Sequence, residues 1–263
     1  MTTTPVLTPV GVGFHNVDKS FVQGERQVHA LNDCTLDVRP GEFFSLLGPS
    51  GTGKTTLLNL VSGFDSADSG AVTVGDVPVR RPGPDRAVVF QSPTLMPWLT
   101  ALDNVAVGLR STGMSRSARR RAAAEQLAEV GLASAAGRRP YQLSGGMRQR
   151  VGIARALAMK PKVLLMDEPF AALDAYVRLE AQQLIVDLHH KHPVTTIFVT
   201  HSIEEALLLS DRVGVMTGGR VDQVYDVPFT HPRDATSPEF NDLRREIWEQ
   251  IEAGVRRDRA ARG

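Results

Sequence analysis

A glycine-rich stretch near position 50 carries residue types that bind phosphate. Its members are Gly48, Pro49, Ser50, Gly51, Thr52, Gly53, Lys54, Thr55 and Thr56. The glycines allow backbone conformations that turn successive N–H groups toward phosphate oxygens. In a loop with this spacing, Lys54 would reach the β- and γ-phosphates of a nucleotide, and the Thr55 hydroxyl would bind Mg²⁺. Because an apolar run precedes the stretch and a helical run follows it, a triphosphate-binding loop is favoured over an ordinary turn.

Two adjacent carboxylates, Asp167 and Glu168, follow the apolar run from 163 to 166. The carboxyl edge of a parallel sheet is where such folds bind their ligands. In a phosphate-loop nucleoside triphosphatase, an acid at the position of Asp167 holds Mg²⁺. Glu168 would orient the attacking water or accept its proton. A merely solvated strand end is the less favoured alternative, because the phosphate loop lies upstream.

Ser144, Gly145 and Gly146 open a helical pattern and form a third group suited to anions. A capping serine followed by two glycines leaves the backbone N–H groups of a helix start accessible to a negative charge. Alone, such a sequence most often marks a plain helix cap. Combined with the phosphate loop and the acid pair, it becomes a specific signal for a nucleotide site.

The elements that must position these residues alternate between strands and helices. Residues 10–38 show the period-2 pattern of half-buried antiparallel strands, and 43–47 is the short apolar run of a buried parallel strand. From 163 to 216, further apolar runs alternate with helical patterns, which predicts an α/β fold with a parallel sheet. Between 92 and 157 the patterns are helical, which indicates an inserted helical subdomain.

The end of the chain has one amphipathic helical pattern. Phe240, Leu243, Ile247 and Ile251 recur at helical spacing and form its apolar face. We expect this helix to dock on the core. Its Arg-rich end, residues 256–262, is expected to fray.

Composition excludes several classes of protein. The chain has 263 residues, of which 42% are hydrophobic, and a formal net charge of +1, so it offers no global electrostatic argument for binding nucleic acid. No apolar window approaches the roughly 20 residues that span a bilayer, and we expect a cytosolic protein. The single cysteine, Cys34, can form no internal disulfide and is interpreted as a small buried side chain.

Taken together, the motifs resemble those of the nucleotide-binding subunits of ATP-binding cassette (ABC) transporters, over nearly the whole chain. They are the Walker A loop at 48–55, a Q-loop glutamine at Gln91, the family signature at 143–149, Walker B at 163–167, a D-loop at 172–174 and a switch histidine at His201. The resemblance implies an α/β fold with a P-loop NTPase (RecA-like) parallel-sheet core, an antiparallel β-subdomain and an inserted α-helical subdomain. It also implies an ABC ATPase domain over residues 1–230, with the helical insert at about 92–157, and a C-terminal helical extension over 231–263.

The resemblance further implies an ATPase that uses ATP and Mg²⁺, with roles for single residues. Phe21 would stack on adenine, Gln91 would contact Mg²⁺ or the attacking water, and His201 would hydrogen-bond the γ-phosphate. ATP would lie between the Walker A loop of one subunit and the Ser144–Gly146 segment of a second copy arranged head to tail. Asp174 would cross to that second copy. Ser202 departs from the aspartate that import cassettes commonly have after the switch histidine, which would tune the switch without changing its identity.

Additional motifs resemble the group of cassettes that import nitrate, sulfonates and taurine. These are the segments 95–100, 103–105, 167–170 and 231–234. We therefore expect an ATPase at the cytoplasmic face of the inner membrane that powers solute uptake through a separate permease, with an extracytoplasmic solute-binding protein as an indirect partner. In this setting, Trp98 would either line a groove for a permease helix or anchor the helical insert.

Alternative functions within the same superfamily are less favoured. A DNA-repair ATPase would need a long insertion between the Walker A loop and the signature, and a translation-type ATPase would carry two cassettes in one chain. An exporter would usually have its membrane helices fused to the cassette. The sequence shows a short insert, one Walker A loop and no fused membrane helices.

Overall fold

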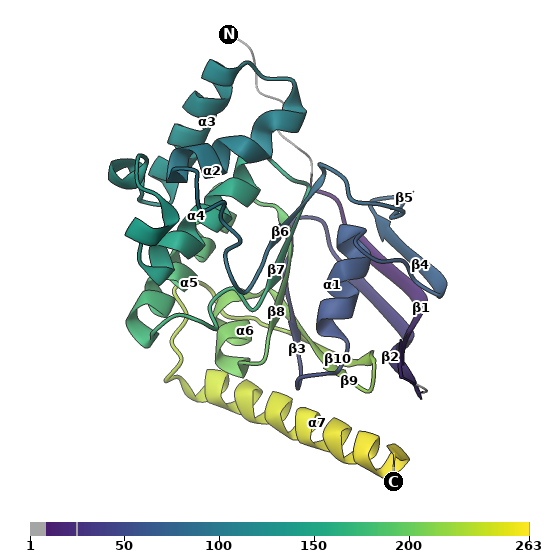
Figure 1. Cartoon of the computed structure of the whole chain (residues 1–263). Coiled ribbons are helices and arrows are strands. Elements are labelled where there is room, and N and C mark those ends of the chain that lie inside the picture. The colour runs from purple at the N-terminus through teal and green to yellow at the C-terminus, as the bar shows by residue number, and fades with distance from the viewer. Residues whose placement is uncertain (1–8, 25, 263) are drawn as a thin grey trace. The chain divides into compact units, whose positions relative to one another are not determined.

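The computed structural model describes residues 9–24 and 26–262 (Figure 1). They fall into two compact units, one built from Pro84–Val194 and the other from Val10–Gly83 together with Thr195–Gly263. The units differ in formal charge. Pro84–Val194 contains 15 Lys and Arg against 9 Asp and Glu, and the other unit contains 15 against 20. Their net charges of +6 and −5 sum to the +1 of the whole chain.

An antiparallel sheet occupies the first part of the larger unit. Its strands are β1 (Val12–Gln23), β2 (Arg26–Val38), β4 (Ser69–Val74) and β5 (Val77–Pro78), in the order β2-β1-β4-β5. The alternation in residues 10–38 is seen at Val12 and Phe14 on β1 and at Cys34, Leu36 and Val38 on β2, which are all buried. Burial raises the pKa of the Cys34 thiol to about 11, which keeps it protonated and supports its interpretation as a core residue.

Parallel strands form the second part of the same unit. β3 (Phe43–Leu47) pairs in parallel with both β8 (Thr195–Thr200) and β9 (Arg212–Thr217), and β10 (Arg220–Asp226) pairs antiparallel to β9. Every residue of β3 and β8 is buried, as expected for strands covered on both faces. The helices α1 (Lys54–Ser62) and α6 (Ile203–Leu209) follow β3 and β8 directly.

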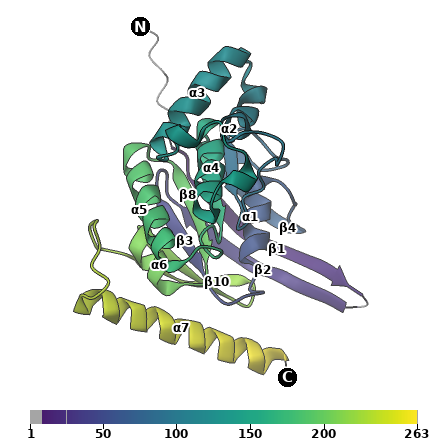
Figure 2. The ribbon, with the colours of Figure 1, turned by 60° about the vertical axis from the view of Figure 1, so that its left-hand side comes forward.

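The C-terminal helix α7 (Pro238–Arg262) is the long yellow helix of Figure 2. It contacts α6 and β9. Phe240 and Ile247 are buried with residues of β9 and α6, and Leu243 and Ile251 pack against that cluster, so the predicted docking face is confirmed. The predicted fraying is wrong. The helix continues to Arg262, and Arg257 near its end forms an ion pair with Asp222 on β10 at 2.7 Å.

The unit built from Pro84–Val194 is mostly helical. Its two strands, β6 (Arg86–Val89) and β7 (Val163–Asp167), pair in parallel. Its helices are α2 (Ala101–Gly108), α3 (Arg116–Glu129), α4 (Gly145–Ala158) and α5 (Ala175–Lys191), with short 3₁₀ turns at Leu109–Thr112, Ala133–Ala135 and Pro140–Gln142.

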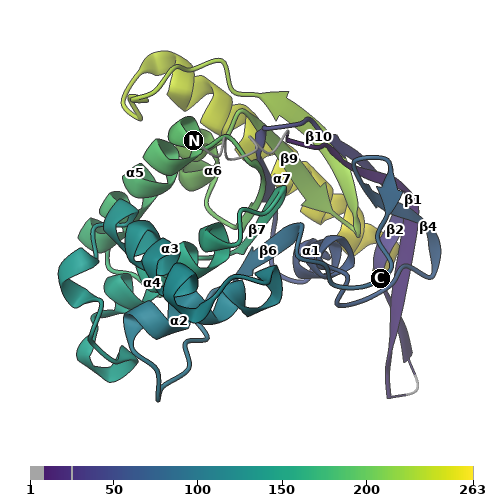
Figure 3. The same ribbon diagram turned by 90° about the horizontal axis from the view of Figure 1, so that it is seen from above.

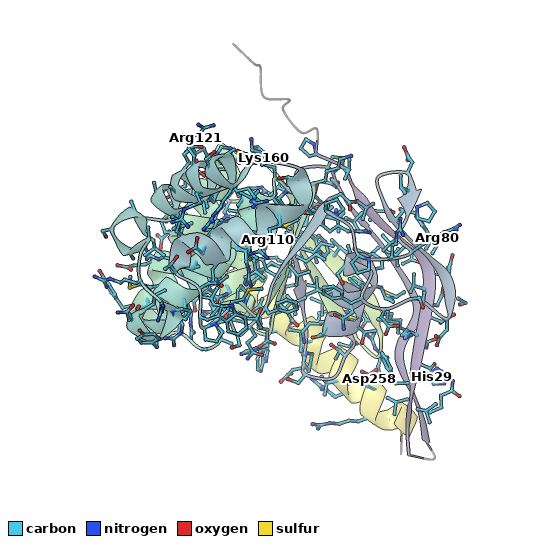
Figure 4. All side chains as sticks on the ribbon, turned by 45° about the horizontal axis from the view of Figure 1, so that its top comes forward. His29, Arg80, Arg110, Arg121, Lys160 and Asp258 are labelled. Atoms are coloured by element: carbon cyan, nitrogen blue, oxygen red, sulfur yellow. The ribbon has the colours of Figure 1, made fainter. Side chains whose placement is uncertain are left out.

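Figure 3 shows α2, α3 and α4 gathered together, and each of the three contacts the other two. Arg121 lies exposed on α3 (Figure 4), in keeping with a solvated helix face. The helices therefore lie where the sequence predicts an insert. The domain boundaries at 92, 157 and 230 stay a prediction.

Candidate active site

The phosphate loop connects β3 to α1. Gly51 and Gly53 have φ angles of 79° and 99°, in the left-handed region that other residues rarely adopt. Gly53 is the N-cap of α1, and Lys54 begins the helix. The Thr52 hydroxyl donates a hydrogen bond to the Pro49 carbonyl oxygen at 3.0 Å, which closes the loop on itself. The predicted strand–loop–helix arrangement is confirmed.

The ammonium group of Lys54 is held within this loop. Lys54 is only 5% exposed, and its Nζ donates to the carbonyl oxygens of Gly48 at 2.7 Å and Pro49 at 2.8 Å. A buried charge needs such partners, because water no longer solvates it. Ser50, Gly51 and Thr55 are exposed, and Thr56 is partly buried. The loop thus combines a fixed positive charge with an accessible rim.

Two glycines of the loop are required by close backbone packing. A Cβ at Gly48 would collide with the carbonyl oxygen of Met216, at the end of β9. A Cβ at Gly53 would stand 2.9 Å from Met216 Cε and would collide with the carbonyl oxygen of Ala30 on β2. The motif alone does not reveal this requirement, since both neighbours are distant in the sequence.

His201 follows β8 at the edge where the phosphate loop follows β3. Leu47 is paired with Thr200, so the two strands end side by side. His201 is exposed. The next residue, Ser202, is the N-cap of α6, and its Oγ accepts a hydrogen bond from the Glu205 backbone N–H at 3.2 Å. Serine therefore performs the capping that aspartate also performs, without the negative charge.

Phe21 lies on β1 with 43% of its surface exposed. The Lys19 Nζ is 5.2 Å from the centre of the Phe21 ring and donates to Asp65 and to the Ser66 carbonyl oxygen, both at 2.8 Å. The hydrogen bond to Asp65 raises the pKa of Lys19, which keeps the ammonium charged beside the ring. An exposed aromatic face is what stacking on a nucleobase requires. Sequence analysis missed Lys19, although its two-residue spacing from Phe21 predicts a shared strand face.

Asp167 is the last residue of β7, in the unit built from Pro84–Val194, and Glu168 follows it directly. Both are partly buried, and Gln91, which follows β6, is exposed. Val89 of β6 is paired with Met166 of β7, so Gln91 and the acid pair leave the same edge of this strand pair. Glu168 has a φ angle of 42°, which is strained for a residue with a side chain and costs on the order of 1–3 kcal/mol. Such strain is concentrated at active sites.

The signature residues begin α4. Ser144 is exposed and is the N-cap, since its Oγ accepts a hydrogen bond from the Met147 backbone N–H at 3.2 Å. The two glycines differ. A Cβ at Gly146 would collide with Val177 of α5, whereas a Cβ at Gly145 would meet no atom closer than 3.9 Å among those outside its own turn. Gly146 therefore allows the two helices to pack, and Gly145 leaves the helix start open.

Asp174 has a role within its own chain. It is the N-cap of α5, and its Oδ1 accepts a hydrogen bond from the Val177 backbone N–H at 3.0 Å. Its exposure leaves the carboxylate accessible from outside. Its predicted contact with a second copy stays a prediction.

Two side chains of α4 hold the segment around Gln91, and sequence analysis missed this role. Arg155 donates from Nη1 to the Thr94 carbonyl oxygen at 2.8 Å, and Gln149 donates to the Phe90 carbonyl oxygen at 3.4 Å. Burial lowers the pKa of the Arg155 guanidinium. Trp98, further along this segment, is 70% exposed, so its interpretation as a core anchor of the helical insert is wrong.

The predicted residues thus form two groups, one in each unit. The phosphate loop, His201 and Phe21 belong to the unit with Val10–Gly83, and Gln91, Ser144, Asp167, Glu168 and Asp174 to the unit with Pro84–Val194. Among the residues that the structure describes, no group of three His, Cys, Asp or Glu side chains is placed to hold a metal ion. Within the same residues, no helix combines the length and apolar character of a membrane span.

Comparison with known proteins identifies the family. The family model described as ABC transporter matches residues 31–171. The chain belongs to the ABC transporter family. The cassette is 48% identical over 232 residues to the taurine import ATP-binding protein TauB of Chromobacterium violaceum, which covers 84% of the chain and 89% of TauB. It is also 43% identical over 249 residues to the nitrate import ATP-binding protein NrtD of Synechococcus elongatus, covering 90% and 91% of the two chains.

A solved structure supports the fold of the cassette. The ATP-binding cassette MJ0796, determined as a dimer in a post-hydrolysis state with ADP and Pi, superposes with a TM-score of 0.75 and 35% identity. The match covers 83% of the cassette and all of MJ0796. The predicted family, the P-loop NTPase fold class and the classification as an ATP-binding ATPase are confirmed.

Proposed function

We propose that this cassette is the ATP-hydrolysing subunit of an importer, and that its phosphate loop binds the β- and γ-phosphates of ATP. The observation that carries the proposal is the loop itself, with Gly51 and Gly53 in left-handed conformations and Lys54 buried against its carbonyl oxygens. On nucleotide binding, the Lys54 ammonium exchanges these carbonyl oxygens for phosphate oxygens. Phe21 stacks on the adenine from its exposed face.

The hydrolytic residues are assigned by position and chemistry. Glu168 orients the attacking water or accepts its proton, and its strained backbone is a sign that its position is functional. His201 donates a hydrogen bond to the γ-phosphate. Gln91 contacts the attacking water, and α4 holds the segment on either side of Gln91 through Gln149 and Arg155.

Mg²⁺ suits the donor atoms of the three residues that we assign as its ligands. Thr55 would contribute a hydroxyl, Asp167 a carboxylate and Gln91 an amide oxygen, and oxygen atoms are the ligands that Mg²⁺ prefers. When bound, the ion would neutralise charge on the phosphates.

Two copies would close on ATP in a head-to-tail arrangement. In this arrangement the exposed Ser144 and the helix start that Gly145 leaves open approach the ATP held by the other copy, together with the backbone of Gly146. Asp174 approaches that copy with its free carboxylate oxygen. The dimeric state of MJ0796 supports this proposal by similarity. ATP then bridges two anion-binding surfaces, and hydrolysis removes the bridge.

The membrane partner is a separate permease, and the cassette is peripheral to the cytoplasmic face of the inner membrane. The names of TauB and NrtD support import of a small anion or organosulfur compound, such as nitrate, a sulfonate or taurine. Trp98 is exposed in the segment after Gln91 and is suited to contact the permease. A solute-binding protein would act on the permease from the other side of the membrane.

Replacing the proposed base tests the hydrolytic assignment. We expect Glu168→Gln to lower the ATP turnover number at least about 100-fold, because general base catalysis typically contributes that much. The dissociation constant for ATP should stay near the wild-type value, since the substitution removes no phosphate ligand. Glu180→Gln, at an exposed position of α5, is the matched control and should keep wild-type turnover. Wild-type turnover of Glu168→Gln would contradict the assignment.

A further inference from the structure

We propose that α7 positions the phosphate loop of its own chain through the turn between β9 and β10. The proposal rests on the proposed binding of nucleotide by this loop. It concerns the Arg-rich end of the chain, to which the proposed function assigns no role. The contacts involved all lie within the unit formed by Val10–Gly83 and Thr195–Gly263.

The last turns of α7 hold the β9–β10 turn by an ion pair. Arg257 donates from Nη2 to Asp222 Oδ2 at 2.7 Å, and the same carboxylate oxygen accepts a hydrogen bond from the Thr217 hydroxyl. The Asp222 side chain is 9% exposed and Thr217 is 2% exposed. Thr217 is the last residue of β9, so this buried contact links α7 to the end of that strand.

The backbone of α7 is also in close contact with the same turn. A Cβ at Gly254 would stand 2.5 Å from the Thr217 side chain, and a Cβ at Gly218 would stand 2.5 Å from Asp258 Oδ1. Asp258 is labelled on α7 in Figure 4. We name this set of contacts the C-terminal clamp, made of Gly254, Arg257 and Asp258 on α7 with Thr217, Gly218 and Asp222.

The residue that precedes the clamp touches the phosphate loop. Met216 comes directly before Thr217, and its carbonyl oxygen leaves no room for a side chain at Gly48, at the start of the loop. Its Cε would be 2.9 Å from a Cβ at Gly53, the N-cap of α1. On the other side of the turn, the Gly219 carbonyl oxygen accepts a hydrogen bond from the Asn32 N–H of β2 at 3.0 Å.

These contacts connect α7 to the phosphate loop in two steps. The clamp restrains Thr217 and Gly218. Because Met216 directly precedes Thr217, its position is restrained too, and Met216 limits where Gly48 and Gly53 can lie. A backbone that packs this tightly transmits small displacements, because protein interiors have few voids to absorb them. Release of the clamp should therefore loosen the phosphate loop and weaken nucleotide binding without removing any phosphate ligand.

Arg257→Ala tests this role in the full-length chain, with Mg-ADP as the probe because it cannot be hydrolysed at a γ-phosphate. We expect its dissociation constant, measured by calorimetry, to rise roughly two- to fivefold, the range for loss of a partly exposed ion pair. Arg256→Ala is the matched control, because Arg256 is 76% exposed and pairs with Glu252 of its own helix at 3.0 Å. Arg257→Lys, which keeps the charge, should restore part of the affinity.

Hydrogen exchange separates positioning from a general loss of stability. In Arg257→Ala we expect faster exchange at residues 47–54 and 216–222, with unchanged exchange in α6. Gly254→Ala is a second variant, since alanine favours the helix but its Cβ would press on Thr217. It should weaken Mg-ADP binding, and its effect should not add to that of Arg257→Ala.

Three results would overturn the inference. They are wild-type Mg-ADP affinity in a folded Arg257→Ala variant, an equal loss in Arg256→Ala, and additive effects of the two clamp variants. Failure of the wild-type chain itself to bind Mg-ADP would instead contradict the proposed function. The two proposals are therefore tested separately.

Discussion

Lys54 shows how one residue prepares a site for its ligand. Its ammonium group is almost fully buried, and two of its partners are backbone carbonyl oxygens, which are neutral. Phosphate oxygens carry negative charge and make stronger hydrogen bonds with an ammonium group than carbonyl oxygens do. The side chain is therefore held within the loop, and its hydrogen bonds to these two carbonyl oxygens can be exchanged favourably for bonds to phosphate.

Removal of this charge should impair binding itself. We expect Lys54→Ala to raise the dissociation constant for ATP at least about tenfold, because a hydrogen bond to a charged group contributes roughly 1.5–3 kcal/mol. Lys162→Ala, at an exposed position before β7, is the control and should bind ATP as the wild type does. Calorimetry that finds wild-type affinity in Lys54→Ala would contradict the assignment of this loop.

Sequence analysis could predict the residues of the site but not all their local roles. The phosphate loop and the acid pair were predictable, because their motifs are continuous and depend on neighbouring residues. The left-handed backbone of Glu168, the capping role of Asp174 and the contact of Lys19 with Phe21 were not predicted. The contact of Met216 with Gly48 depends on a pairing between distant strands, which no local pattern reveals.

At the scale of elements, His201 lies between the end of β8 and the start of α6. Ser202 caps the helix, and the Thr200 hydroxyl donates to the carboxylate of Glu205 at 2.7 Å. His201 lies between these two anchored residues. The cap therefore holds the backbone of His201 in place, even though His201 itself is exposed.

Substitution of the cap should destabilise this element. We expect Ser202→Ala to lower the free energy of unfolding by about 1 kcal/mol, the usual cost of losing an N-cap side chain. Ser202→Asp should retain the cap and match the wild type within about 0.5 kcal/mol, because a negative charge is favourable at a helix N-terminus. Urea unfolding measures both. Equal stability of Ser202→Ala and the wild type would show that the cap contributes nothing.

The elements that sequence analysis missed or misjudged lie where contacts override local pattern. β10 contains mostly polar residues, so its pairing with β9 has little apolar alternation to reveal it. The Arg-rich end of α7 was expected to fray from its composition, but Asp222, 35 residues away, pairs with Arg257. The buried strands β3 and β8 were predictable because continuous apolar runs identify them directly.

At the scale of the whole molecule, nucleotide should control association. We expect the purified wild-type chain to be largely monomeric without nucleotide, since in the proposed arrangement each copy would supply only part of each nucleotide site. Glu168→Gln with Mg-ATP should form a dimer, because ATP binds but is not removed by hydrolysis. Light scattering distinguishes the two states. A stable dimer without nucleotide would count against ATP as the bridge between the copies.

The unequal charges of the two units have a further consequence for this dimer. In a head-to-tail pair, the signature of each copy, on the unit of charge +6, approaches the phosphate loop of the other, on the unit of charge −5. Opposite net charges on approaching surfaces speed association, and dissolved salt screens them beyond about 10 Å at 0.1 M. The rate at which two copies meet would then fall as salt rises, so the ionic strength of the solution would itself influence how often the cassette completes a cycle.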